Sequence, residues 1–146
     1  MSAELISRPP LLQGDSIQTG RLERDGRPIR VVVAEDESVV ALDLQTTIQR
    51  AGGAIVGIAI RGQDAITLAA ALRPDVVLMD VHLVGDLDGV ETAKAIKALR
   101  GIGIVFVTAH ADAETMRRMF DVVSTAPVIK PISDLQLREA IIRACH

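Results

Sequence analysis

The chain is poor in residue types that mark several classes of protein. Its single cysteine, Cys145, excludes an internal disulfide framework and a cysteine metal cluster. It has no tryptophan or tyrosine and only two phenylalanines, so it lacks the aromatic platforms on which nucleic-acid bases stack. The net charge of −3 also argues against nucleic-acid binding, because phosphate backbones are bound by basic faces. We therefore expect no direct binding to nucleic acid.

Long apolar runs are missing as well. None reaches the roughly 20 residues needed to cross a membrane. The first 20 residues lack the basic start and apolar stretch of a secretory signal. No GxGxxG turn follows the first predicted strand, which argues against a dinucleotide-binding domain. We expect a cytoplasmic protein without a membrane partner.

The 146 residues leave room for one domain, which the pattern places at residues 29–146. Residues 1–28 are polar and contain Pro9-Pro10, so we expect a flexible or loosely packed arm. Beyond the arm, apolar runs alternate with helical spacing. The runs predict strands at residues 31–34, 54–60, 75–80, 103–108 and within 122–129. The spacing predicts helices at residues 38–51, 65–72, 90–99, about 112–120 and from 133 onward.

This alternation predicts the fold class. Strands that are buried on both faces and alternate with helices form a parallel sheet covered on both sides, which is an α/β three-layer sandwich. Ser133 with Gln136 suggests a capping box at the start of the last helix. Met116, Met119 and Phe120 lie at helical spacing and are expected in the core.

Polar residues stand where four of the predicted strands end. In a parallel sheet, ligands bind beyond the carboxyl ends of the strands. The residues delivered there are Glu35, Asp36, Asp80, Thr108 and Lys130. Three neighbouring carboxylates repel one another, and a divalent cation between them would relieve that repulsion. Mg²⁺ prefers such oxygen ligands, so the set predicts a magnesium site.

The same residues suit phosphoryl transfer. Asp80 follows a buried strand and is best placed as a nucleophile that forms an aspartyl phosphate. The Lys130 ammonium and the Thr108 hydroxyl can each stabilise a phosphoryl oxygen. His82 and His110 would flank the mouth of the site. Two isolated histidines are most often surface residues, and control of the phosphate lifetime is the alternative interpretation.

Four motifs together resemble the receiver domain of two-component response regulators: AED (34–36), LMD (78–80), VTAH (107–110) and IKP (129–131). The resemblance covers about residues 29–146. It implies a flavodoxin-like (βα)5 fold with strand order 2-1-3-4-5. It also implies transfer of a phosphoryl group from a phosphohistidine of a sensor kinase to Asp80.

The resemblance assigns roles to single residues. The Mg²⁺ ligands would be Glu35 or Asp36, Asp80 and the backbone carbonyl of His82. Ala109 would be the small residue beside the phosphoryl group, which Thr108 and Lys130 would also contact. The peptide bond between Lys130 and Pro131 would be cis.

The sequence departs from the family pattern at two places. The loop VHLVGDLDG after Asp80 is one residue longer than the commonest version, as in a subgroup that includes partners of HWE-type histidine kinases. Pro127 stands where the family usually has Tyr, Phe or His as a switch residue. Proline has no ring to swing and no N–H for a central strand. We therefore predict that the aromatic switch is absent and that the fifth strand is shortened or bulged.

The sequence thus predicts a single-domain response regulator that is not a turnover enzyme. It would accept a phosphoryl group on Asp80 with Mg²⁺ and signal by binding an unidentified downstream protein or by passing the group to a phosphotransfer protein. The region from residue 112 onward resembles the usual output surface, which is also a common dimer face, so a homodimer is one option. One alternative is a phosphorylation-independent protein-binding module. A phosphohydrolase is disfavoured, because those enzymes carry a second aspartate where this chain has His82.

Overall fold

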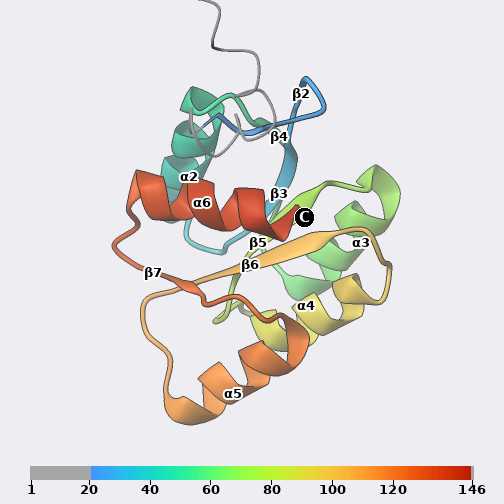
Figure 1. The fold of residues 1–146 in the computed structure, drawn as a ribbon. Helices are drawn as coiled ribbons and strands as arrows, with labels where there is room; N and C mark the ends of the chain where they lie inside the picture. Colours follow the sequence, from blue (N-terminus) through green and yellow to red (C-terminus); the bar gives the residue numbers. More distant parts are fainter. Residues whose placement is uncertain (1–20, 146) are drawn as a thin grey trace, which may run out of the picture.

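A computed structural model describes residues 21–145, and its centre is a five-stranded parallel sheet. The strands are β3 (Arg30–Ala34), β4 (Ala54–Ala59), β5 (Val76–Asp80), β6 (Gly103–Thr108) and β7 (Val128–Ile129). Their order across the sheet is β4-β3-β5-β6-β7 (Figure 1). Counted from β3, this is the expected 2-1-3-4-5 order of a flavodoxin-like fold.

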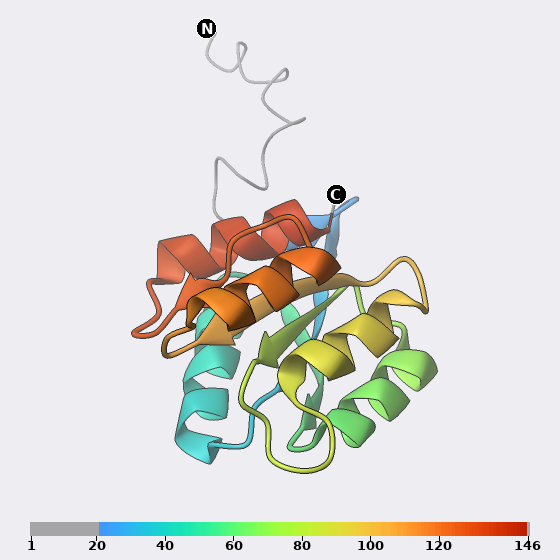
Figure 2. The ribbon, with the colours of Figure 1, turned by 90° about the horizontal axis from the view of Figure 1, so that it is seen from below.

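Helices cover both faces of the sheet. They are α2 (Ser38–Arg50), α3 (Gly62–Leu72), α4 (Gly89–Lys97), α5 (Ala113–Val122) and α6 (Asp134–Ala144). Figures 1 and 2 show α2 and α6 on one face and α3, α4 and α5 on the other. The predicted three-layer α/β sandwich is confirmed. No helix among residues 21–145 has the length and apolar character needed to cross a membrane.

The central strands are apolar throughout because both of their faces are buried. Val31 and Val33 pack into the core beneath α2 and α6, whereas Val32 packs into the core beneath α3, α4 and α5. β5 lies between β3 and β6 and is buried along its whole length. The alternation of side chains across a strand thus places one valine run in two cores.

The two outer strands differ from the buried pattern predicted for them. β4 lies at one edge, and most of its residues are only partly buried. At the other edge α5 continues to Val122, and β7 contains only Val128 and Ile129. The expected shortening of the fifth strand is therefore confirmed. Pro127 directly precedes β7, where its missing N–H interrupts no ladder.

The residues just before the sheet are ordered. β1 (Glu23–Arg24) and β2 (Arg27–Pro28) form an antiparallel hairpin whose turn residues, Asp25 and Gly26, have φ angles of 55° and 76°. Leu22 is fully buried, and its N–H donates to the carbonyl of Ala51 at 2.8 Å. The expectation of a loose arm up to residue 28 is therefore wrong for residues 22–28. Residues 1–20 of that arm lie outside the described residues.

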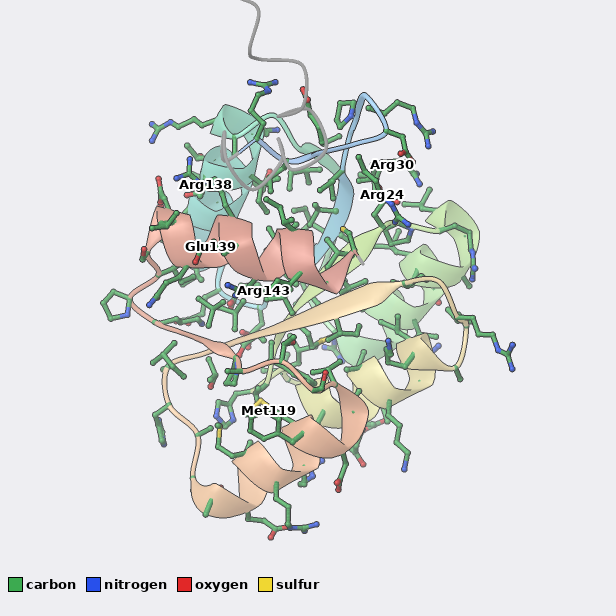
Figure 3. All side chains as sticks on the ribbon, in the orientation of Figure 1. Arg24, Arg30, Met119, Arg138, Glu139 and Arg143 are labelled. Carbon is green, nitrogen blue, oxygen red and sulfur yellow. The ribbon has the colours of Figure 1, made fainter. Side chains whose placement is uncertain are left out.

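Helix α5 corrects one core prediction. Met119 is buried and points from α5 toward the sheet (Figure 3). Phe120 is instead 46% exposed, because the residue next to Met119 lies about 100° around the helix.

Capping residues fix the ends of two helices near the carboxyl edge of the sheet. Asp88 and Glu91 form a reciprocal capping box at the start of α4. The Ser133 hydroxyl accepts the Gln136 N–H at 3.3 Å, which supplies one half of the box predicted for α6.

Replacing Leu22 tests whether the hairpin belongs to the folded core. Leu22→Ala should lower the free energy of unfolding by about 2–5 kcal/mol, because a buried leucine is replaced by a cavity. Leu42→Ala is the matched control, since Leu42 is 61% exposed on α2, and it should change stability by less than about 0.5 kcal/mol. Urea denaturation measures both. Equal losses would show that Leu22 contributes no more than a surface residue.

Candidate functional site

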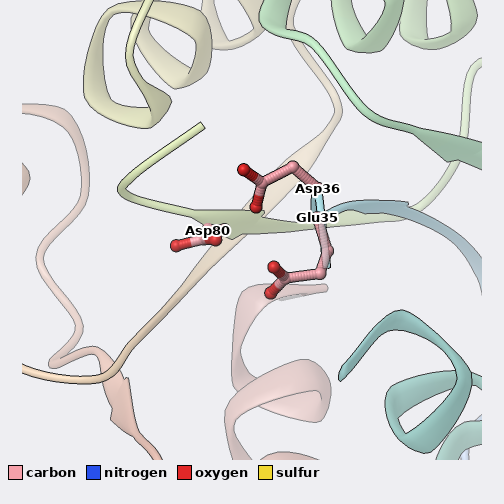
Figure 4. Close-up of side chains that lie close together, drawn as sticks. All are labelled: Glu35, Asp36 and Asp80. Atoms are coloured by element: carbon pink, nitrogen blue, oxygen red, sulfur yellow. The ribbon is translucent and has the colours of Figure 1, made fainter. Parts of the chain in front are cut away.

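Three carboxylates meet at the carboxyl edge of the sheet. Glu35 and Asp36 follow β3, and Asp80 is the last residue of β5, the strand paired with β3. One oxygen from each carboxylate lies within 4.8 Å of the others, and the three groups face a common space (Figure 4). Glu35 and Asp80 are buried, whereas Asp36 is partly exposed. The topology therefore brings together the acids that the sequence singled out.

Lys130 supplies positive charge to this cluster from the far strand. Its Nζ lies 3.1 Å from Glu35 Oε1 and 4.0 Å from Asp80 Oδ2. The Lys130 N–H donates to the carbonyl of Thr108 at 2.8 Å, which fixes the main chain just after β7. The next peptide bond, Lys130–Pro131, is cis, the isomer that the resemblance implies. The ammonium thus offsets part of the negative charge of two buried carboxylates.

Backbone N–H groups orient the same two carboxylates. The Glu37 N–H donates to Glu35 Oε2 at 3.2 Å, and the His82 N–H donates to Asp80 Oδ1 at 3.0 Å. Sequence reasoning did not identify these donors, because a main-chain group carries no side-chain signature. Each carboxylate is held by one oxygen, which leaves the other oxygen directed toward Lys130.

Burial changes the ionisation of Glu35. Removal from water, followed by the neighbouring Asp80 carboxylate, raises the pKa of Glu35 to about 7, although the Glu37 N–H and Lys130 favour the charged form. The cluster therefore carries an electrostatic cost near neutral pH.

The donor set fits a hard divalent cation. Oxygens from three carboxylates converge, and Mg²⁺ is typically held by one or two carboxylates together with water and phosphate oxygens. When all three acids are ionised, their negative charge exceeds the single positive charge of Lys130. Glu35, Asp36 and Asp80 would hold the cation, and the carbonyl of His82 stays a predicted ligand.

Thr108 is the last residue of β6, but its hydroxyl does not donate to the carboxylates. Its side chain is fully buried, and its hydroxyl donates to the carbonyl of His110 at 2.8 Å. A hydroxyl with this partner must rotate before it can donate to a phosphoryl oxygen beside Asp80. Ala109 is exposed next to it and leaves the approach from solvent open.

Gly89, the last residue of the loop VHLVGDLDG, is a structural residue of the site. A Cβ at this position would lie 2.0 Å from the carbonyl oxygen of Asp80 and 2.7 Å from Cα of Val81. Only glycine lets the first turn of α4 approach the end of β5 so closely.

The longer loop before Gly89 is joined to two other parts of the chain. Its residue Val84 forms an isolated parallel β-bridge with Arg61. Asp88 also binds Arg118 at 2.9 Å, which links this loop to α5.

Comparison with known proteins identifies the domain. The family model described as "Response regulator receiver domain" matches residues 31–142. Transcriptional regulatory protein PdtaR of Mycobacterium tuberculosis is 38% identical over 114 residues, which cover 78% of this chain and 55% of PdtaR. Response regulator protein VraR of Staphylococcus saprophyticus is 31% identical over 116 residues, with the same coverages. The chain therefore spans about half the length of these curated relatives.

A solved structure supports the same assignment. The signal receiver domain of a modulated diguanylate cyclase from Desulfovibrio desulfuricans G20 superimposes with a TM-score of 0.76 at 34% identity. The match covers 80% of this chain and 93% of that domain. With the residues matched by the family model and the carboxylate edge described above, these similarities show that the chain belongs to the response regulator receiver domain family.

Proposed function

We propose that this receiver domain accepts a phosphoryl group on Asp80, with Mg²⁺ bound by Glu35, Asp36 and Asp80. One observation carries the proposal: the Asp80 carboxylate lies between two further acids and the Lys130 ammonium, at an edge that is open beside Ala109. The two acids and Asp80 suit a hard cation, and the ammonium suits a phosphoryl oxygen.

The two oxygens of Asp80 would have different tasks. Oδ1 accepts the His82 N–H, which holds the carboxylate in place. Oδ2, the oxygen nearest Lys130, would attack phosphorus. The new O–P bond forms as the N–P bond of the donor phosphohistidine breaks, and the electron pair of that bond returns to the imidazole nitrogen. Mg²⁺ held by Glu35, Asp36 and Asp80 would supply charge neutralisation at the phosphoryl oxygens.

Thr108 would then carry the change to the surface. Its hydroxyl would leave the carbonyl of His110 and donate to a phosphoryl oxygen. Lys130 would keep its bond to Glu35 and neutralise another oxygen. Because Pro127 has no ring to follow Thr108 inward, the loop after Thr108 and helix α5 would transmit the signal.

Phosphoryl transfer to Asp80 would involve a donor protein and an output partner. The donor would be a sensor histidine kinase in the cytoplasm. The output would be binding to a downstream protein, transfer to a phosphotransfer protein, or pairing with a second copy. The domain would modify itself and not turn over an external substrate. Pro127 favours the competing role of a receiver-like module that binds its partner without phosphorylation.

Intact mass spectrometry tests the phosphoacceptor. Wild-type protein incubated with Mg²⁺ and a phosphorylated histidine-kinase donor should gain one phosphoryl group. Asp80→Asn should gain none, because an amide does not attack phosphorus as a carboxylate does. Asp64→Asn, which alters an exposed aspartate on α3, is the matched control and should label like wild type. Absence of label on folded, Mg²⁺-bound wild type would favour the phosphorylation-independent module.

The ionisation of Glu35 predicts how stability depends on pH without metal. Its folded-state pKa of about 7 exceeds the ordinary value of 4.5, so the folded chain binds more protons between these values. The free energy of unfolding should therefore fall as pH rises from about 4.5 to 7. Urea denaturation in EDTA should show this fall in wild type and much less of it in Glu35→Gln.

Glu37→Gln is the control for this measurement, because Glu37 is exposed and its N–H is unchanged by the substitution. It should keep the wild-type pH dependence. A Glu35→Gln profile parallel to that of wild type would contradict the raised pKa.

A further inference from the structure

Two histidines lie side by side beyond the ends of β5 and β6. His82 follows Asp80 by two residues, and His110 follows Thr108 by two residues, at the ends of the paired strands β5 and β6. Both side chains are exposed, and their ring centroids are 6.2 Å apart with the planes tilted by 36°. They are the only histidines among the described residues 21–145.

The separation suits one metal ion between the rings. A zinc ion about 2.0–2.1 Å from one nitrogen of each ring holds the ring centroids roughly 5 to 6 Å apart. The observed 6.2 Å is close to this range, and exposed side chains can adjust by rotation. Neutral imidazole is a preferred ligand of zinc, copper and nickel, whereas carboxylate edges suit magnesium.

Water can supply the remaining ligands of a metal held by two imidazoles, because zinc sites with fewer than four protein ligands complete their coordination with water. Among the described residues, the only group of three or more His, Cys, Asp or Glu side chains placed to share a metal ion is Glu35, Asp36 and Asp80. The two imidazoles would therefore hold the metal without a third side chain.

We infer that the His82 and His110 imidazoles form a binding site for a divalent transition metal such as Zn²⁺, distinct from the carboxylate site. The two sites would take different cations. The nitrogen donors would select the transition metal, and the oxygen donors of the carboxylate site would select Mg²⁺.

The main chain couples this site to phosphoryl transfer. The His82 N–H holds Asp80 Oδ1 at 3.0 Å, and the His110 carbonyl holds the Thr108 hydroxyl at 2.8 Å. A metal that joins the two imidazoles would tie the loops after β5 and β6 together. It would favour the bond between Thr108 and His110 and cover the approach to Asp80. Bound zinc would therefore slow phosphorylation, a consequence that rests on the proposed function of Asp80.

Zinc titration with nuclear magnetic resonance of the imidazole C–H groups tests the site. The full chain is titrated with ZnCl₂ in excess Mg²⁺, which keeps the carboxylate site filled. The His82 and His110 resonances should change together and saturate at one equivalent. His82→Gln and His110→Gln should each weaken zinc binding at least tenfold, whereas His146→Gln should leave it unchanged. Wild-type affinity in either of the first two variants, or no saturable change, would overturn the site.

Phosphorylation rates with and without zinc test the coupling, each variant being compared with itself. Zinc should slow labelling of wild type several-fold and leave His110→Gln unaffected. Equal slowing of both proteins would overturn the coupling. If wild type takes no label even without zinc, the proposed function of Asp80 fails and the coupling fails with it. The imidazole resonances still decide the metal site in that case.

Discussion

Mutual repulsion among Glu35, Asp36 and Asp80 is the constraint around which this domain is organised. Three carboxylates with oxygens within 4.8 Å of one another are costly to keep ionised without compensating charge. The protein supplies part of it through Lys130, whose ammonium lies 3.1 Å from Glu35, and through backbone N–H groups. The charge that remains uncompensated makes the cluster a group that could hold a metal ion. The parallel sheet brings the carboxyl ends of four strands to one edge, and five polar side chains therefore meet there.

The loops that complete the edge serve more than one purpose. The chain after β5 orients Asp80 through the His82 N–H, and the chain after β6 holds the Thr108 hydroxyl through the His110 carbonyl. The same two residues carry the paired imidazoles. Movement of the loop after β5 would shift the Asp80 carboxylate, and movement of the loop after β6 would shift the Thr108 hydroxyl. Each movement would also displace one of the two imidazoles. Under the proposed function, these loops and α5 would carry the signal from Asp80 to a partner, because Pro127 has no ring to move.

Much of this arrangement could be predicted from the sequence, because buried strands and their polar ends leave a clear pattern. The apolar run before Asp80 located β5, and the site followed from what came next. The hairpin was missed although Asp25-Gly26 is a strong two-residue turn signal. Phe120 was misplaced because helical spacing alone does not tell which neighbour faces the sheet. The close approach of Gly89 to Asp80 depends on tertiary packing, which no local pattern records.

Urea denaturation of wild type and Asp36→Asn, each with EDTA and with Mg²⁺, tests the central claim most directly. If the carboxylates repel one another and a cation relieves that repulsion, Asp36→Asn should be more stable than wild type in EDTA. Mg²⁺ should stabilise wild type strongly and the variant much less, since the variant has lost a charged ligand. A variant that is less stable in EDTA, or that gains as much from Mg²⁺ as wild type, would contradict the account.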